Sequence, residues 1–136
     1  MNKVLVSICI AGTALAMSSC RSVEKAIPLS SINGEWNIIE VNGSKVTPGE
    51  SRTLPFITFD TATGRVSGNS GCNRMMGSFD VNAKPGSLSL GAMAGTKMMC
   101  PDMTTERNVL GALAQVKGYK KAGKDKMYLC NASNRP

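Results

Sequence analysis

Short β-rich runs separated by tight-turn signals fill the sequence from residue 33 onward, and they constrain the fold more than any other feature. Asn42 followed by Gly43 is a strong signal for a two-residue hairpin turn. Further turns are indicated around residues 84–86 and 122–125. The expected strands are residues 36–41, 56–60, 65–68, 77–81, 87–90, 119–121 and 126–130. Six or seven short strands joined in this way predict a strongly curved antiparallel sheet.

One segment near the C-terminus has helical periodicity instead. Its apolar positions, spaced so that they share one helical face, are Val109, Leu110, Leu113 and Val116. Asp102 is a suitable N-cap and Gly118 suits the position just beyond the end, so we predict a helix over residues 103–117. A single helix that covers one face of a curved antiparallel sheet makes an α+β fold. The expected fold class is therefore α+β, with about six or seven strands and one helix.

The first 19 residues have the composition of a secretory signal peptide. Lys3 supplies the positive start, an apolar stretch covers residues 4–16, and small residues directly precede Cys20. The apolar stretch is about 13 residues long, whereas a helix that crosses a bilayer needs roughly 20. We therefore expect residues 1–19 to be a leader outside the fold.

Two ways of processing this leader compete. Residues 14–16 fit an ordinary cleavage site, which would leave a soluble protein that starts at Met17. We favour the second reading, because residues 17–20 resemble a lipobox in which the Cys20 thiol is diacylated before cleavage. Two or three acyl chains anchor a protein stably to a membrane. The expected organisation is a signal peptide at residues 1–19, a lipidated N-terminus and tether at residues 20–32, and one domain at residues 33–136.

The positive net charge bears on the choice of partner. Removing the leader takes away Lys3 alone, so 15 Lys and Arg remain against 9 Asp and Glu, a net charge of +6. An excess of positive charge is compatible with nucleic-acid binding. Aromatic residues for base stacking, however, make up only 4% of the chain, and we expect the chain to be exported. A basic surface near anionic lipid is the better reading. We expect a monomer held at the membrane through Cys20, with no nucleic-acid partner.

Two short segments carry a resemblance to a known family. Residues 71–74 read Gly-Cys-Asn-Arg with Gly77 just beyond, and residues 96–101 read Thr-Lys-Met-Met-Cys-Pro. In this order, after the runs at residues 34–41 and 57–60, they resemble the META domain, the HslJ-like family of small bacterial proteins, many of them lipoproteins. The resemblance covers about residues 32–129 and implies a compact α+β fold. It implies no activity, because members are associated only broadly with envelope or heat stress, motility and secretion.

The sequence departs from this family at its C-terminal end. The family usually continues, after the strand that matches residues 127–130, with another turn and an apolar strand. Here only residues 131–136 follow. A missing strand would leave unpaired backbone on a sheet edge. We expect either a truncated chain or an edge that is completed in another way.

The remaining cysteines are odd in number. Cys72, Cys100 and Cys130 follow Cys20, and export permits disulfides, so one thiol is left over. The resemblance places Cys72 and Cys100 in its two motif segments, which implies that they are joined while Cys130 stays free. Two separate thiols in packed strands are the alternative. A third reading makes Cys100 reactive, because it lies just ahead of the expected helix start, where the macrodipole favours a thiolate.

Catalytic and cofactor patterns are missing from the sequence. The chain has no His, which excludes Ser-His-Asp and Cys-His arrangements. The cysteines form no CxxC pair for a zinc site, and no Gly-rich phosphate-binding motif is present. We therefore expect no enzyme, no metal and no cofactor.

The two motif segments are the candidate recognition surface. If residues 67–77 and 98–103 lie close together, polar contacts and adaptable apolar area come from Asn69, Asn73, Arg74, Met98 and Met99. The alternative is that the same residues only build a bulged turn and its packing. The expected function is a non-enzymatic envelope lipoprotein that binds or assists another component under stress, anchored in the outer membrane and facing the periplasm. The rival functions are a thiol-redox protein that uses Cys100 or Cys72, and a carrier of a small apolar ligand in a dry, methionine-lined pocket.

Overall fold

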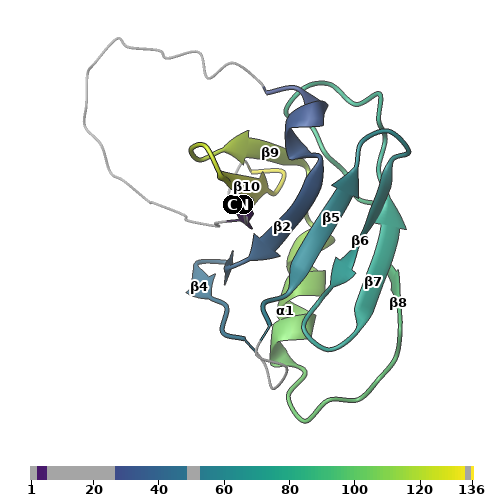
Figure 1. Ribbon diagram of the computed structural model, residues 1–136, viewed down its shortest axis with the longest axis vertical. Helices are drawn as coiled ribbons and strands as arrows, with labels where there is room; N and C mark the ends of the chain where they lie inside the picture. Colours follow the sequence, from purple (N-terminus) through teal and green to yellow (C-terminus); the bar gives the residue numbers. More distant parts are fainter. Residues whose placement is uncertain (1–2, 6–26, 49–52, 134–135) are drawn as a thin grey trace, which may run out of the picture.

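The computed structural model describes residues 3–5, 27–48, 53–133 and 136, and it shows one large sheet with a helix against one face (Figure 1). The strand order in the sheet is β8-β7-β6-β5-β2-β1-β10-β9. These strands are β1 (Lys3–Leu5), β2 (Gly34–Ile38), β5 (Phe56–Asp60), β6 (Arg65–Asn69), β7 (Arg74–Ser78), β8 (Ala94–Gly95), β9 (Gly118–Lys121) and β10 (Lys126–Cys130). The remaining elements are η1 (Leu29–Ile32), β3 (Glu40–Val41), β4 (Ser44–Lys45) and α1 (Thr104–Leu113). The α+β prediction is confirmed.

Alternation of buried and exposed residues explains the antiparallel part of the sheet, which runs from β2 to β8. On β5, Ile57 and Phe59 are buried while their neighbours are not. Ile57 stands opposite Trp36 of β2, so both side chains enter the core on the same face. Phe59 packs edge-on against Phe79, with ring centroids 5.7 Å apart. Strands β2, β5, β6 and β7 thus contribute buried apolar residues to the core, whereas both residues of β8 are exposed.

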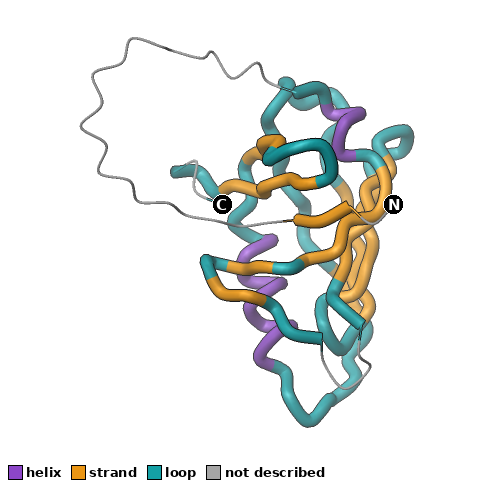
Figure 2. The backbone as a smooth tube through the Cα atoms, turned by 60° about the vertical axis from the view of Figure 1, so that its left-hand side comes forward, coloured by secondary structure: helices purple, strands orange, loops and turns teal. Residues whose placement is uncertain are grey.

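Helix α1 covers this core (Figure 2), but it is shorter than expected. Val109 and Leu113 are buried, as the periodicity predicts. The helix ends at Leu113 rather than at residue 117, because the backbone N–H of Lys117 already donates to the carbonyl of Cys130 (2.8 Å). Gly118 is therefore the first residue of β9 rather than a helix cap. Asp102 also lies one residue before the N-cap, although its carboxylate accepts the N–H of Thr104 (2.8 Å).

Three strand predictions need correction. The run at residues 36–41 is split into β2 and β3, and β3 pairs with β4 across the expected Asn42, Gly43 turn. The strand expected at 77–81 begins earlier, because the N–H of Ser70 bonds to the carbonyl of Asn73 (3.0 Å) and closes a tight turn before β7. Residues 87–90 make isolated bridges instead of a strand: Ser87 pairs with Gly118 and Leu90 with Phe79. The segment therefore runs from the edge of β9 at Ser87 to the end of β7 at Leu90.

The folded region begins before the expected boundary at residue 33. Ile32 is fully buried, and Ile27 and Leu29 pack against the core. The indole N–H of Trp36 donates to the carbonyl of Ile32 (2.7 Å), which ties η1 to β2. The segment from residue 27 therefore belongs to the domain rather than to the tether. Cys20 and the rest of the expected tether lie outside the described residues.

The N-terminal strand β1 was also not expected from the sequence. It pairs in parallel with β2 on one side and with β10 on the other, so the sheet is not antiparallel throughout. Residues 3–5 fall within the expected leader, and in the full-length chain they are part of the sheet. Within the described part of the chain, no helix is long and apolar enough to cross a membrane.

Candidate functional site

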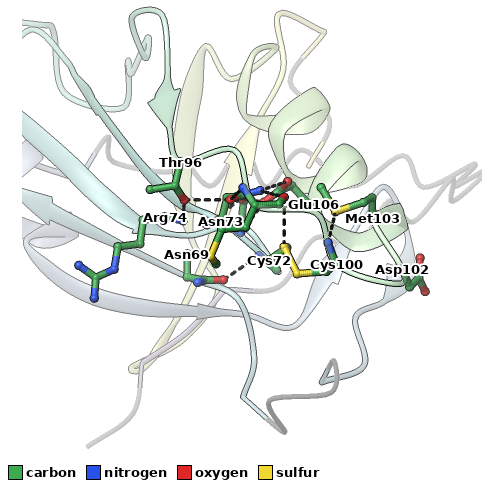
Figure 3. The surroundings of a disulfide bond; sticks show 12 residues. Asn69, Cys72, Asn73, Arg74, Thr96, Cys100, Asp102, Met103 and Glu106 are labelled. Atoms are coloured by element: carbon green, nitrogen blue, oxygen red, sulfur yellow. Dashed lines mark hydrogen bonds between the residues drawn. A yellow bond between two sulfur atoms is a disulfide. The ribbon is translucent and has the colours of Figure 1, made fainter.

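The two motif segments meet at a disulfide. Cys72, in the turn between β6 and β7, is joined to Cys100, which lies in the loop ahead of α1 (Figure 3). Their Cα atoms are 6.1 Å apart. This is the pairing that the family resemblance implies. Cys130 is buried at the end of β10 and is not part of the disulfide.

Glu106 lies at the centre of the hydrogen bonds behind the disulfide. Its side chain, only 6% exposed, extends from the first turn of α1 toward the turn between β6 and β7. Oε1 accepts from the Ser70 hydroxyl (2.6 Å) and from the backbone N–H of Asn73 (2.7 Å), and Oε2 accepts from the Asn73 amide (2.8 Å). The carboxylate thus fixes the start of the helix to the first motif segment.

The hydrogen bonds to Glu106 decide its ionisation. Burial alone would raise the pKa of this carboxyl. Hydrogen bonds from the side chains of Ser70 and Asn73, and from the backbone N–H groups of Asn73 and Cys72, outweigh that effect and lower the pKa below its ordinary value. Glu106 is therefore a carboxylate at neutral pH, and each of these donors faces a negative charge.

Asn73 connects the same network to the second motif segment. Its Oδ1 accepts from the backbone N–H of Met98 (2.6 Å) and from the Thr96 hydroxyl (2.9 Å), while its Nδ2 donates to the Met98 carbonyl (3.0 Å). The side chain is only 5% exposed. The expectation that Asn73 belongs to the recognition surface is therefore wrong. Its carboxamide instead bonds both backbone groups of Met98 and fixes the course of the exposed loop.

The conformation of Gly71 allows the two segments to come this close. Its φ of +133° lies in the region that side chains rarely adopt. A Cβ at this position would also lie 3.2 Å from the backbone nitrogen of Glu106 and 3.3 Å from Cγ2 of Thr105. Glycine in the first motif segment is thus explained by packing against the start of α1.

The other residues of the candidate surface are accessible, but they do not share one direction. Met98 is 58% and Met99 87% exposed. Arg74 is exposed on β7 and points away from the disulfide (Figure 3). Asn69 is half-buried, and its Oδ1 accepts the N–H of Gly71 (2.8 Å), so it stabilises the turn. The apolar part of the expected surface is therefore the pair Met98 and Met99.

A cleft of about 440 Å³ lies beside the disulfide. Cys72 and Cys100 line it together with Asn69, Met98 and Thr105, and Pro55, just before β5, is another lining residue. Its lining mixes polar side chains with prolines and the disulfide and includes one methionine, so this cleft is not the methionine-lined dry pocket expected for a carrier of apolar ligands. No three His, Cys, Asp or Glu side chains within the described residues come together in a way that could hold a metal ion.

Sequence reasoning missed Glu106, and it included Ser70 and Thr96 in the two motif segments without giving either a role. An acidic residue in the first turn of a helix is a recognisable local signal, and Glu106 occupies that place. Nothing local indicates that this carboxylate turns inward to a loop 33 residues earlier in the chain. The roles of Ser70 and Thr96 as hydrogen-bond donors become visible only when the positions of their acceptors, Glu106 and Asn73, are known.

A family model described as META domain matches residues 28–136. An NMR structure of a protein from Burkholderia xenovorans is similar, with a TM-score of 0.57 and 26% sequence identity. That match covers 77% of this chain and 79% of the other. The curated proteins contain no match to this chain.

Proposed function

The chain belongs to the META domain family, and from that membership and the geometry around the disulfide we propose that it is a non-enzymatic lipoprotein of the bacterial envelope that binds another envelope component. The observation that carries the proposal is the loop that presents Met98 and Met99. Both side chains are exposed to solvent while the backbone of Met98 is held by Asn73. The proposed binding surface, the methionine edge, consists of these two side chains.

The methionine edge has the properties of a preformed recognition site. The Asn73 carboxamide holds the backbone of Met98, and the disulfide holds Cys100 directly after Met99. A fixed backbone lowers the conformational entropy lost on binding. Flexible thioether side chains can then adapt to an apolar partner surface. We infer that the partner offers an apolar patch. If this protein takes part in the response to envelope or heat stress, it would do so through that partner.

Exchange of both methionines for glutamine tests the recognition surface. Met98→Gln and Met99→Gln keep the side-chain length but remove apolar area, so partner capture should fall at least about tenfold, a change of about 1.4 kcal/mol. Capture is measured by crosslinking in intact cells and mass spectrometry. Met76→Gln is the matched control, because Met76 is 55% exposed on β7, outside this loop. Equal capture by the double variant and the wild type would contradict the proposal.

Membrane attachment through Cys20 is the second part of the proposal. It is supported by the small residues before Cys20 and by family membership. Two or three acyl chains give stable anchoring, and the proposed position is the outer membrane, facing the periplasm. Labelled palmitate should enter the wild type and not Cys20→Ala. A mature protein that begins at an unmodified Met17 would show that the lipid anchor is absent.

A further inference from the structure

The hairpin formed by β9 and β10 gathers four lysines at one edge of the sheet (Figure 1). Lys120 and Lys121 end β9, Lys124 lies in the turn, and Lys126 begins β10. Asp125 is the only acidic residue of the hairpin. Four Lys against one Asp give a net charge of +3, half of the +6 that the chain carries without its leader. We call this part of the fold the lysine hairpin.

The charges of the lysine hairpin are not neutralised by their neighbours across the two strands. Lys120 is half-buried, and the other three lysines are exposed. Lys120 stands opposite Tyr128 and Lys121 opposite Met127, so neither faces a carboxylate. Lysine side chains keep their ammonium groups in water at the end of long flexible stems. The hairpin therefore presents a concentrated positive charge to a partner outside the fold.

The chain that follows the proposed lipid anchor enters the fold beside this hairpin. The hydroxyl group of Tyr119 on β9 donates to the carbonyl of Ile27 (2.9 Å), which lies where the described part of the domain begins. Ile27 follows Cys20 by seven positions, and a chain of that length spans at most about 25 Å when fully extended. A lipid at Cys20 would therefore keep β9 close to the bilayer surface.

The loop that carries Met98 and Met99 lies at the other end of the molecule. It connects β8 to the start of α1, and both views place it far from β9 (Figure 1, Figure 2). The short tether brings the domain to the membrane, but it does not select the face that turns toward the lipid. The charge of the lysine hairpin can make that selection, and the methionine edge would then point away from the bilayer.

We propose that the lysine hairpin is the membrane-docking surface of this protein and binds the anionic headgroups of the bilayer that carries the lipid anchor. The orientation rests on the anchor at Cys20 that belongs to the proposed function, whereas the attraction to anionic headgroups does not. Each lysine close to an anionic bilayer strengthens binding roughly fivefold, and the attraction falls off within a Debye length. Docking in this way leaves the methionine edge accessible to a partner in the periplasm.

Vesicle binding by the unlipidated full chain tests the attraction. The probes are vesicles of phosphatidylcholine alone and of phosphatidylcholine mixed with phosphatidylglycerol. The ratio of the two partition coefficients reports the effect of headgroup charge, because the apolar leader contributes to both. Exchange of Lys121, Lys124 and Lys126 together for glutamine should lower this ratio about a hundredfold. High salt should lower the ratio of the wild type to that of the variant.

A matched control removes the same amount of charge elsewhere. It exchanges for glutamine three exposed cations outside the hairpin, Arg74, Lys97 and Arg107. Because these side chains lie beyond a Debye length from a bilayer that contacts the hairpin, the control should lower the ratio less than about fivefold. Lysines also protect a sheet edge from association. If the hairpin variant aggregates, Lys124→Gln alone, which lies outside the strands, should still lower the ratio roughly fivefold.

Amine labelling of the lipidated protein tests the orientation. On mixed vesicles a water-soluble amine reagent should modify Lys121 several-fold more slowly than on phosphatidylcholine, and Lys97 equally fast on both. Equal losses in the two triple variants, or a wild type without preference for phosphatidylglycerol, would overturn the proposal. A hairpin variant that keeps this preference but loses partner capture in cells would assign the lysines to an acidic protein and would also overturn it. The vesicle ratio does not depend on palmitate at Cys20, so the docking surface and the lipid anchor fail separately.

Discussion

Replacement of Glu106 by alanine should lower the free energy of unfolding by about 4 kcal/mol, because several buried donors would lose one shared acceptor. The Ser70 hydroxyl, the Asn73 backbone N–H and the Asn73 amide all donate to this carboxylate. A buried donor without a partner costs roughly 1–3 kcal/mol, and more when the partner was charged. The measurement is urea unfolding of the oxidised protein.

Two further variants make this prediction specific. Glu106→Gln keeps the volume and one acceptor oxygen, so it should lose about 2 kcal/mol, roughly the difference between a charged and a neutral hydrogen-bond acceptor. Arg107→Ala changes the exposed neighbour on the same helix and should stay within about 0.5 kcal/mol of the wild type. A loss below about 1 kcal/mol for Glu106→Ala would mean that water satisfies the donors and that the network adds little.

The lowered pKa of Glu106 gives the same prediction a pH dependence. A carboxyl group whose folded-state pKa lies below its unfolded value stabilises the fold fully above the unfolded pKa, about 4.3 for Glu. That contribution is lost as the pH falls through the lower folded pKa. Asp60 and Asp102 also have lowered pKa values, but both are exposed and present in every variant. The stability difference between the wild type and Glu106→Gln should therefore shrink in acid.

Local patterns predicted the elements whose burial repeats at short range. The period of Val109 and Leu113 placed the helix, and alternation placed β5 within its observed bounds. The ends of these elements were harder to place, because distant partners decide them. The helix stops at Leu113, ahead of the bond from Lys117 to Cys130, and β7 starts where the Ser70 turn closes. A two-residue strand such as β8 has no periodicity to detect, since its place depends on pairing with Met75 and Met76.

The candidate site also has a part that the sequence predicted and a part that depends on distant partners. The family resemblance predicted the Cys72 and Cys100 pair, because the motif segments contain both residues. Composition suggested Asn73 as a surface residue, since the amide side chain next to Arg74 is polar and such residues are usually exposed. Sequence cannot show that a carboxylate and a backbone segment from elsewhere satisfy that amide. In the sequence, a motif residue that makes a structural hydrogen bond looks the same as one that contacts a binding partner. The two can be distinguished only when the residues around them in the fold are known.

Loss of the Cys72 and Cys100 disulfide should lower the free energy of unfolding by about 3–4 kcal/mol, because the bond closes a loop over 28 positions and restricts the unfolded chain. The variant is Cys72→Ser with Cys100→Ser, measured by urea unfolding. Reduced wild type is the control and should match it, since Cys130 lies outside the bond.

The disulfide and Glu106 hold the same turn from two sides, so their losses should not add. Without the disulfide, the turn at Cys72 can move away from α1, and part of the bonding to Glu106 is already weakened. Combining the serine pair with Glu106→Ala should therefore cost at least about 1 kcal/mol less than the sum of the separate losses, as expected for groups in contact. Additive losses would show that the bond acts only on the unfolded chain. A coupled loss would mean that reduction also releases the loop carrying Met98, and partner capture should then fall in reductant as it does in the methionine variants.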